Sequence, residues 1–212
     1  MKPFDSANIV YCDNHLLVVD KPPGVATQPD LEILAKAWVK KKYQKPGNVF
    51  LEPIHRLDKS VGGLVLFART SKALSRLQAL MRERKISKIY QALIEGLLPK
   101  KEATLTHYLV HGDHKAFVDP QGKEAILHYH VLEEKNGTTL VSIDLATGRY
   151  HQIRAQFAAT GHPILGDRKY GSKHNFHEGI ALRHVRMEFE HPITHEKCVF
   201  ECTKDSLRNP NT

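Results

Sequence analysis

Apolar and polar positions follow two different periods along the chain, and this predicts a mixture of strands and helices. Runs of strand length, with alternating or continuous apolar residues between Gly, Pro or polar breaks, lie at 16–19, 63–68, 86–94, 125–132, 138–145, 181–189 and 197–202. Gly137 predicts a hairpin turn between two of these strands. Strands outnumber helices, several are joined by tight turns, and no regular strand–helix alternation appears. The pattern favours an α+β fold, a mainly antiparallel mixed sheet with flanking helices.

Three segments show the helical period instead. Asp30 is expected to cap a helix that ends near Tyr43, with one apolar stripe formed by Leu31, Leu34 and Trp38. Ser71 is expected to cap a second helix. Its inward face would carry Leu74, Leu77 and Met81, and its outward face would carry Arg76, Arg82 and Arg84. A third helix is predicted over 150–160, ended by Gly161 and Pro163.

Composition and net charge indicate a folded single-domain protein with a polyanionic partner. The 212 residues are 41% hydrophobic and 25% charged, and no Pro/Gly/Ser-rich linker divides them, so we expect one domain over residues 1–212. Three cysteines, no apolar h-region at the N-terminus and no long apolar run predict a cytoplasmic protein away from the membrane. The net charge of +8 favours a polyanionic partner such as RNA.

An aspartate lies on a glycine-ended loop directly before a predicted buried strand, in the segment Ile54-His55-Arg56-Leu57-Asp58-Lys59-Ser60-Val61-Gly62-Gly63. Such a loop can present a side chain at the end of a sheet while the backbone is held rigidly. Taken alone, however, Asp58 more often caps a turn or pairs with Arg56. The loop is therefore a candidate for catalysis that needs support from elsewhere in the chain.

A second candidate precedes the third helix, in Gly148-Arg149-Tyr150-His151-Gln152-Ile153-Arg154. Arg154 could pair with Asp58 and keep that carboxylate ionised, although it could also be one more exposed basic residue. Strand alternation in Lys88-Ile89-Tyr90 places Lys88 and Tyr90 on one face, where Tyr90 could stack on a base or simply fill the core.

Metal and nucleotide chemistry find little support in the sequence. No glycine-rich phosphate loop is present. The 14 histidines include His107, His111 and His114, but these are expected in a loop without a metal-binding helix motif, and Cys198 and Cys202 lack a second ligand pair. We therefore expect neither a metal nor a cofactor.

The motifs resemble, in order, those of the RluA class of pseudouridine synthases. The resemblance covers Asp20-Lys21-Pro22-Pro23-Gly24, His55-Arg56-Leu57-Asp58 with Gly63, Lys88-Ile89-Tyr90, Gly148-Arg149 with His151-Gln152-Ile153-Arg154, Gly161-His162-Pro163-Ile164-Leu165-Gly166-Asp167 with Tyr170-Gly171, and His191-Pro192. Each motif is weak by itself, but their order and spacing are specific. The resemblance implies a sheet crossed by a central catalytic cleft, and isomerisation of uridine to pseudouridine in ribosomal or transfer RNA after base flipping.

The resemblance also implies roles for single residues. Asp58 would be the catalytic aspartate, Tyr90 would stack on the target uracil, and Arg154 would pair with Asp58. Leu182 would pack on the other side of the base, and Arg56 would fill the space that the flipped nucleotide leaves. Further substrate contacts are expected from His55, Arg149, His151 and Gln152.

The chain departs from the family pattern at three places. Val61-Gly62 stands where Thr-Ser is commonest, Tyr150 where Thr or Ser is usual, and Arg183-His184 where His-Ala is usual. These changes concern substrate contacts rather than the three catalytic candidates. The chain starts close to the catalytic motifs, so we expect no N-terminal S4 module, a stem-loop RNA as target, a monomer, and no obligate protein partner. The alternative is a catalytically inactive RNA-binding protein of the same fold, which the retained Asp58, Tyr90 and Arg154 disfavour.

Overall fold

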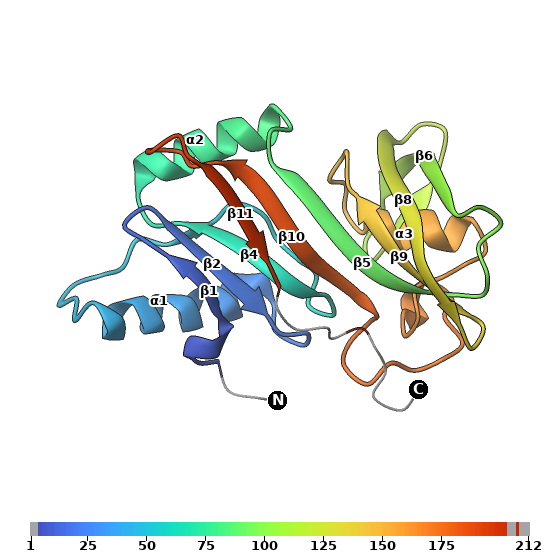
Figure 1. Cartoon of the computed structure of the whole chain (residues 1–212), viewed down its shortest axis with the longest axis horizontal. Coiled ribbons are helices and arrows are strands. Elements are labelled where there is room, and N and C mark those ends of the chain that lie inside the picture. Colours follow the sequence, from blue (N-terminus) through green and yellow to red (C-terminus); the bar gives the residue numbers. More distant parts are fainter. Residues whose placement is uncertain (1–3, 203–206, 208–212) are drawn as a thin grey trace. The chain divides into compact units, whose positions relative to one another are not determined.

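The computed structural model describes residues 4–202 and Leu207. The chain forms two compact units, Met1–Ile86 with Val185–Thr203 (unit 1) and Ser87–His184 with Lys204–Thr212 (unit 2). The first boundary falls at the start of strand β5 and the second falls within strand β10 (Figure 1). Since β10 belongs to both units, its first residues, Leu182–His184, are described with unit 2.

Unit 1 contains a sheet in which the neighbouring strands follow the order β1-β2-β4-β10, with β3 beside β4 and β11 beside β10. The strands are β1 (Ile9–Cys12), β2 (Leu16–Lys21), β3 (Glu52–Pro53), β4 (Gly62–Ala68), β10 (Leu182–Glu190) and β11 (Lys197–Glu201). The helices are α1 (Glu32–Lys42) and α2 (Ser71–Arg82), with short turns at Ser6–Asn8 and Thr27–Leu31. The pairs β1–β2, β2–β4, β3–β4 and β10–β11 are antiparallel.

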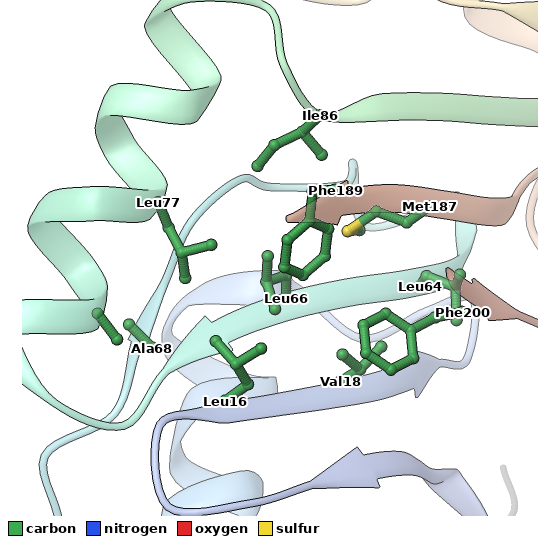
Figure 2. Packing of buried hydrophobic residues seen from close by; sticks show 11 residues of the cluster. Leu16, Val18, Leu64, Leu66, Ala68, Leu77, Ile86, Met187, Phe189 and Phe200 are labelled. Atoms are coloured by element: carbon green, nitrogen blue, oxygen red, sulfur yellow. The ribbon is translucent and has the colours of Figure 1, made fainter. Parts of the chain in front are cut away.

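Strands β2 and β4 are buried along nearly their whole length, because side chains on both of their faces pack into the core. On one face, Leu16 and Val18 of β2 and Leu64 and Leu66 of β4 point into a cluster that Leu77 of α2 closes (Figure 2). The same cluster contains Ala68, Ala73, Ile86, Met187, Phe189 and Phe200. This packing fixes the strand β4, which directly follows the loop of Asp58.

Three details of the predicted helices are wrong. Helix α1 has no side-chain cap, and Oδ2 of Asp30 instead accepts a hydrogen bond from the N–H of Ala26 at 3.2 Å. The buried stripe at the start of α1 is Leu31, Ala35 and Val39, whereas Leu34 is 37% exposed and Trp38 only partly buried. The side chain of Thr70, one residue before Ser71, caps α2 by accepting a hydrogen bond from the backbone N–H of Ala73 at 3.2 Å. An alanine at position 35 gives a weak apolar signal, and adjacent Thr and Ser are both good caps.

Unit 2 contains a sheet of strands in the order β5-β9-β8-β6-β7. They are β5 (Ser87–Glu95), β6 (Glu102–His111), β7 (Ala116–Val118), β8 (Lys123–Lys135) and β9 (Thr138–Asp144), and α3 (Gln152–Ala159) and a 3₁₀ turn (Arg168–Tyr170) follow. These neighbours pair antiparallel. The predicted hairpin turn at Gly137 is confirmed, since Asn136 and Gly137 both have positive φ, as a two-residue turn between twisted strands requires.

Helix α3 packs against β6 and β7, where Ala155 joins Leu109, Ala116 and Ala125 in a small apolar cluster. The fully buried amide of Gln156 donates from Nε2 to the carbonyls of Leu105 (2.9 Å) and Ala125 (3.1 Å). Nδ1 of His107 lies 3.2 Å from the same Nε2 and can only accept from it. His107 and His111 therefore lie in strand β6, and their predicted place in a loop is wrong.

The predicted α+β class with mainly antiparallel strands is confirmed. Neither the extent of a single catalytic domain nor the central cleft is tested within the separate units, and both stay predictions. Among the described residues, no helix has the length and apolar character needed to cross a membrane.

Candidate active site

The loop that carries Asp58 is held by backbone contacts on both sides of the aspartate. The hydroxyl of Thr27 donates to the carbonyl of Leu57 and accepts from the N–H of Leu57, each at 3.0 Å. After the aspartate, the N–H of Val61 donates to the carbonyl of Asp58 at 3.0 Å. Gly63 has φ +112°, a backbone angle that glycine adopts with less strain than any other residue. The peptide that bears Asp58 is therefore rigid, while the side chain itself is partly exposed.

Lys21, at the end of β2, supports the same loop from inside unit 1. Its side chain is fully buried, and its ammonium group donates to the carbonyls of Val25 (2.8 Å), Pro22 (3.2 Å) and Lys59 (3.4 Å). The N–H of Gly24 donates to the carbonyl of Lys59 at 2.7 Å as well. A buried ammonium group needs such partners. The Lys-Pro-Pro-Gly turn is thus bonded to the residue that follows Asp58.

Two further candidates flank the aspartate in unit 1. Nε2 of His55 accepts a hydrogen bond from the backbone N–H of Leu66 at 3.3 Å, so this ring is tied to β4. Arg56 is exposed. Substrate contacts by His55 and Arg56 stay predictions.

In unit 2, Tyr90 on β5 is buried and its ring is stacked on the imidazole of His184, with centroids 4.5 Å apart and an angle of 16°. Because alternate residues of a strand share a face, His184 and Leu182 of β10 lie on the same side of that strand. Leu182 is also buried. One face of the tyrosine ring is therefore covered by an aromatic residue of the same unit.

Lys88 precedes Tyr90 by two positions on β5 and shares its face. Burial lowers the pKa of the Lys88 ammonium group below its usual value, and the charge of Asp144 opposes this only in part. The protonated form of Lys88 is thus less favoured than that of a surface lysine.

Arg154, in the first turn of α3, is buried and makes a two-pronged ion pair with the buried carboxylate of Asp167. Its Nε lies 2.6 Å from Oδ2, and its Nη2 lies 2.8 Å from Oδ1. The guanidinium carbon also lies 5.0 Å from the ring centre of Tyr170. A bidentate pair orients the guanidinium plane more strictly than a single bond would.

His151 lies beside this pair, and its hydrogen bonds indicate which ring nitrogen carries the proton. Nη1 of Arg154 lies 2.9 Å from Nε2 of His151, and since arginine can only donate, Nε2 carries no proton. The proton is therefore on Nδ1, which lies 2.9 Å from the hydroxyl of Tyr170. His151 has φ +50°, an uncommon value outside glycine. The imidazole is thus held between Arg154 and Tyr170.

Gln152 and Arg149 shape the turn before α3. The buried amide of Gln152 accepts at Oε1 from the Thr147 hydroxyl (2.8 Å) and the Arg149 N–H (2.9 Å), and donates from Nε2 to the Ile126 carbonyl (3.1 Å). Nε of the exposed Arg149 donates to the carbonyl of Glu124 at 2.9 Å. The observed bonds of Gln152 hold this turn to β8. Substrate contacts by Arg149, His151 and Gln152 stay predictions.

Sequence reasoning missed four residues that position these candidates: Thr27, Lys21, Asp167 and His184. Asp167 is the last residue of the predicted signature at 161–167, so its motif was visible but its partner was not. Lys21 was visible as a charged residue directly after an apolar strand. Thr27 carried no distinguishing signal, and His184 was visible only as a departure from the family pattern. The expected pairing of Arg154 with Asp58 joins residues of different units and stays a prediction.

Residues 15–159 match the family model described as RNA pseudouridylate synthase. The match spans more than half of the chain and includes Asp58, Tyr90 and Arg154. The chain belongs to this family. The RluA class and the class of enzyme that the motifs predicted, an RNA pseudouridine synthase and thus an isomerase, are confirmed.

Curated pseudouridine synthases are similar over most of the chain. The Dual-specificity RNA pseudouridine synthase RluA of Pasteurella multocida is 36% identical over 200 residues, which cover 89% of each chain. The Ribosomal large subunit pseudouridine synthase C of Buchnera aphidicola is 36% identical over 171 residues, which cover 78% of this chain but only 54% of that protein. The chain thus spans about half the length of the second relative.

Solved structures of pseudouridine synthases share the fold. Human RNA Pseudouridylate Synthase Domain Containing 1 is 26% identical, with a TM-score of 0.77 over 97% of this chain and 86% of that one. Human RNA Pseudouridylate Synthase Domain Containing 4 is 20% identical with a TM-score of 0.80, a likeness of fold alone.

Proposed function

We propose that this pseudouridine synthase converts specific uridines of structured RNA to pseudouridine, with Asp58 as the reacting carboxylate. The observation that carries the proposal is the family match over residues 15–159, which contains Asp58 on a rigid loop, Tyr90 on β5 and Arg154 on α3. The rigid loop of Asp58 in unit 1 and the oriented guanidinium of Arg154 in unit 2 support the proposal.

The reaction breaks the bond from N1 of uracil to C1′ of ribose and forms a bond from C5 to C1′. The proton on C5 leaves and a proton is added at N1, so no oxidation occurs and no external group enters. An ionised carboxylate can attack C1′, as in retaining glycosidases, or can act as a base on the sugar. Both routes need Asp58 without its proton, and a positive charge nearby favours that state.

Arg154 is the residue we propose for that charge. Asp167 and His151 hold its guanidinium on the Nε, Nη2 and Nη1 atoms, so its direction does not depend on the substrate. Catalytic groups that are oriented before the substrate binds cost less reorganisation during the reaction. Asp167 and His151 would therefore be positioning residues for the Arg154–Asp58 pair.

The target uracil would stack on Tyr90 and pack against Leu182. Extruding a base from an RNA helix costs a few kcal/mol, and stacking on an aromatic ring returns about 1–3 kcal/mol. Since His184 covers one face of Tyr90, we propose that uracil uses another part of the ring. Arg56 would fill the place that the base leaves.

We propose ribosomal or transfer RNA as the substrate class. One relative is named for the ribosomal large subunit and another for dual specificity. The net charge of +8 suits a phosphate backbone. We further propose that the chain acts in the cytoplasm, as a monomer and without an obligate protein partner.

The substrate proposal is tested by mapping pseudouridines in total cellular RNA with and without the gene that encodes this chain. We expect one site or a few sites, in ribosomal or transfer RNA, to lose pseudouridine when the gene is removed and to regain it when purified protein is added to that RNA. An unchanged map, together with no product from the purified protein, would refute the proposal.

A further inference from the structure

Three aromatic rings contact one another near the start of α3 in unit 2, in a row that we call the ladder and that reaches solvent. Tyr150 stacks on His151 with ring centroids 3.9 Å apart and an angle of 18°. His111, at the end of β6, lies 4.1 Å from Tyr150 at an angle of 43°. His151 is buried, whereas His111 is exposed and Tyr150 is 40% exposed. A large aromatic side chain is thus open to solvent beside a buried group of the candidate site.

The inner end of this ladder is fixed. Nδ1–H of His151 donates to the hydroxyl of Tyr170, which accepts from the N–H of Ala116 (2.8 Å) and donates to the Ala116 carbonyl (3.1 Å). Nε2 of His151 accepts from Arg154. Tyr150 therefore rests on a ring that is not free to rotate, and it loses little conformational entropy when a further ring stacks on it.

Three cationic residues are close in sequence to Tyr150 or His111, or are bonded to the turn after His111. Arg149 directly precedes Tyr150 and is anchored to the carbonyl of Glu124. Nζ of Lys169 lies 3.0 Å from the carbonyl of His114, in the turn after His111. Lys115 is exposed in the same turn. Aromatic rings interleaved with positive charges suit single-stranded nucleic acid, because bases stack while phosphates pair with the cations.

We propose that Tyr150 is a stacking residue for an unpaired nucleobase of the substrate RNA next to the target uridine. His111 gives way to that base, and Arg149 and Lys169 hold its phosphates. The inference deepens the proposed function by adding a specificity-determining residue to Asp58, Tyr90 and Arg154. The position of the second base beside the target uridine rests on that proposed function. Tyr150 is four positions and His151 three positions before Arg154 in the sequence, so the second base would lie close to the reacting one.

The test compares binding of a short, unstructured, fluorescein-labelled RNA to variants of the full chain by fluorescence anisotropy. Tyr150→Leu keeps apolar bulk over His151 but removes the ring, and we expect Kd to rise about 5- to 50-fold. Tyr150→Phe keeps the ring and should bind within about twofold of the unchanged protein. Tyr108→Leu is the matched control, because Tyr108 is also exposed (46%) in unit 2 and should be neutral.

A second measurement does not depend on the leucine variant folding well. Trp38 is the one tryptophan of the sequence, so a Trp38→Phe, Tyr150→Trp protein carries a single indole at the proposed platform. We expect RNA to quench its fluorescence, as base stacking does. An unquenched indole at saturating RNA would overturn the proposal.

Kinetics separate stacking from mere support of His151. With an RNA substrate, we expect Tyr150→Leu to raise KM and to leave kcat within about threefold. A fall in kcat with unchanged KM and Kd, or equal weakening by Tyr108→Leu, would refute the stacking role. If the unchanged protein forms no pseudouridine but the binding differences appear, the proposed function fails while Tyr150 is still an RNA-stacking residue.

Discussion

At the scale of single residues, the arginine of the candidate site is defined by what holds it. Arg154 and Asp167 are both buried and share two bonds, and Nη1 of Arg154 also bonds to Nε2 of His151. Removing one partner of a buried pair leaves an uncompensated charge and typically costs about 3–5 kcal/mol. The orientation of the Arg154 guanidinium therefore depends on the directions of these bonds as well as on the opposite charge of Asp167.

Replacing Arg154 by lysine tests that geometry while the positive charge is kept. An ammonium group does not reproduce the two parallel bonds to Asp167 together with the bond to His151, so we expect kcat to fall at least about 100-fold. Steady-state kinetics of pseudouridine formation would measure it. Arg82→Lys, at an exposed arginine in the last turn of α2, is the control and should keep kcat within about threefold. Equal effects of the two variants would contradict the role of Arg154.

At the scale of elements, two turns of unit 1 are joined through one carboxylate. Oδ1 of Asp13 accepts from the N–H groups of His15 (2.7 Å) and Leu16 (2.6 Å), and Oδ2 accepts from the hydroxyl of Tyr11 (3.0 Å). Nε2 of His191 lies 3.0 Å from the same Oδ2. The turn between β1 and β2 is thus bonded to the turn between β10 and β11.

These bonds predict a dependence of stability on pH. Burial alone would raise the pKa of Asp13, but the N–H groups of His15 and Leu16 lower it below its usual value of 3.8. A lowered pKa means that the stabilisation is complete above the unfolded value and is lost as the pH falls through the folded value. The pKa of Tyr11 is raised to about 12, mainly by burial and also by its hydrogen bond to Asp13 and the negative charge of that carboxylate.

Asp13→Asn should lower the free energy of unfolding by about 1–3 kcal/mol at pH 7, because the charge-assisted bonds are lost. The difference from the unchanged protein should shrink below about pH 4, where protonation weakens the native carboxylate too. Urea unfolding at pH 7 and at pH 3 would measure both values. A difference that is equal at the two pH values would show that the charge of Asp13 contributes nothing.

Most elements could be predicted from the sequence, but not those with a weak apolar pattern. The inward residues of β6 include Ala103 and His107 beside Leu105 and Leu109, so strand alternation is poorly visible there. Motif order located Asp58, Tyr90 and Arg154. Their partners were not predictable, because Asp167 and His184 lie 13 and 94 positions away from Arg154 and Tyr90, and only tertiary packing brings them together.

At the scale of the whole molecule, positive charge is the property that most affects RNA binding. The net charge of +8 predicts that counterions are released when RNA binds. We expect the affinity for the RNA substrate to fall at least about 10-fold between 50 and 200 mM salt. Anisotropy titrations at several salt concentrations would measure the slope. A Kd that does not change with salt would contradict an interface built on phosphate contacts.

At the same scale, we expect the activity not to depend on a bound metal ion. The described part of the chain holds no group of three or more His, Cys, Asp or Glu side chains that could bind a metal ion. We expect protein that has been stripped with a chelator to keep its full rate of pseudouridine formation. Activity that disappears on stripping and returns with added zinc would reverse the expectation of chemistry without a cofactor.

The most direct test of the central claim uses the hydrogen that the reaction removes from C5. RNA made with uridine tritiated at C5 releases tritium to water for each pseudouridine formed. We predict stoichiometric release by the unchanged protein and none above background by Asp58→Asn, with the variant folded and its Kd for RNA within about threefold. Release by Asp58→Asn at the rate of the unchanged protein would contradict the account.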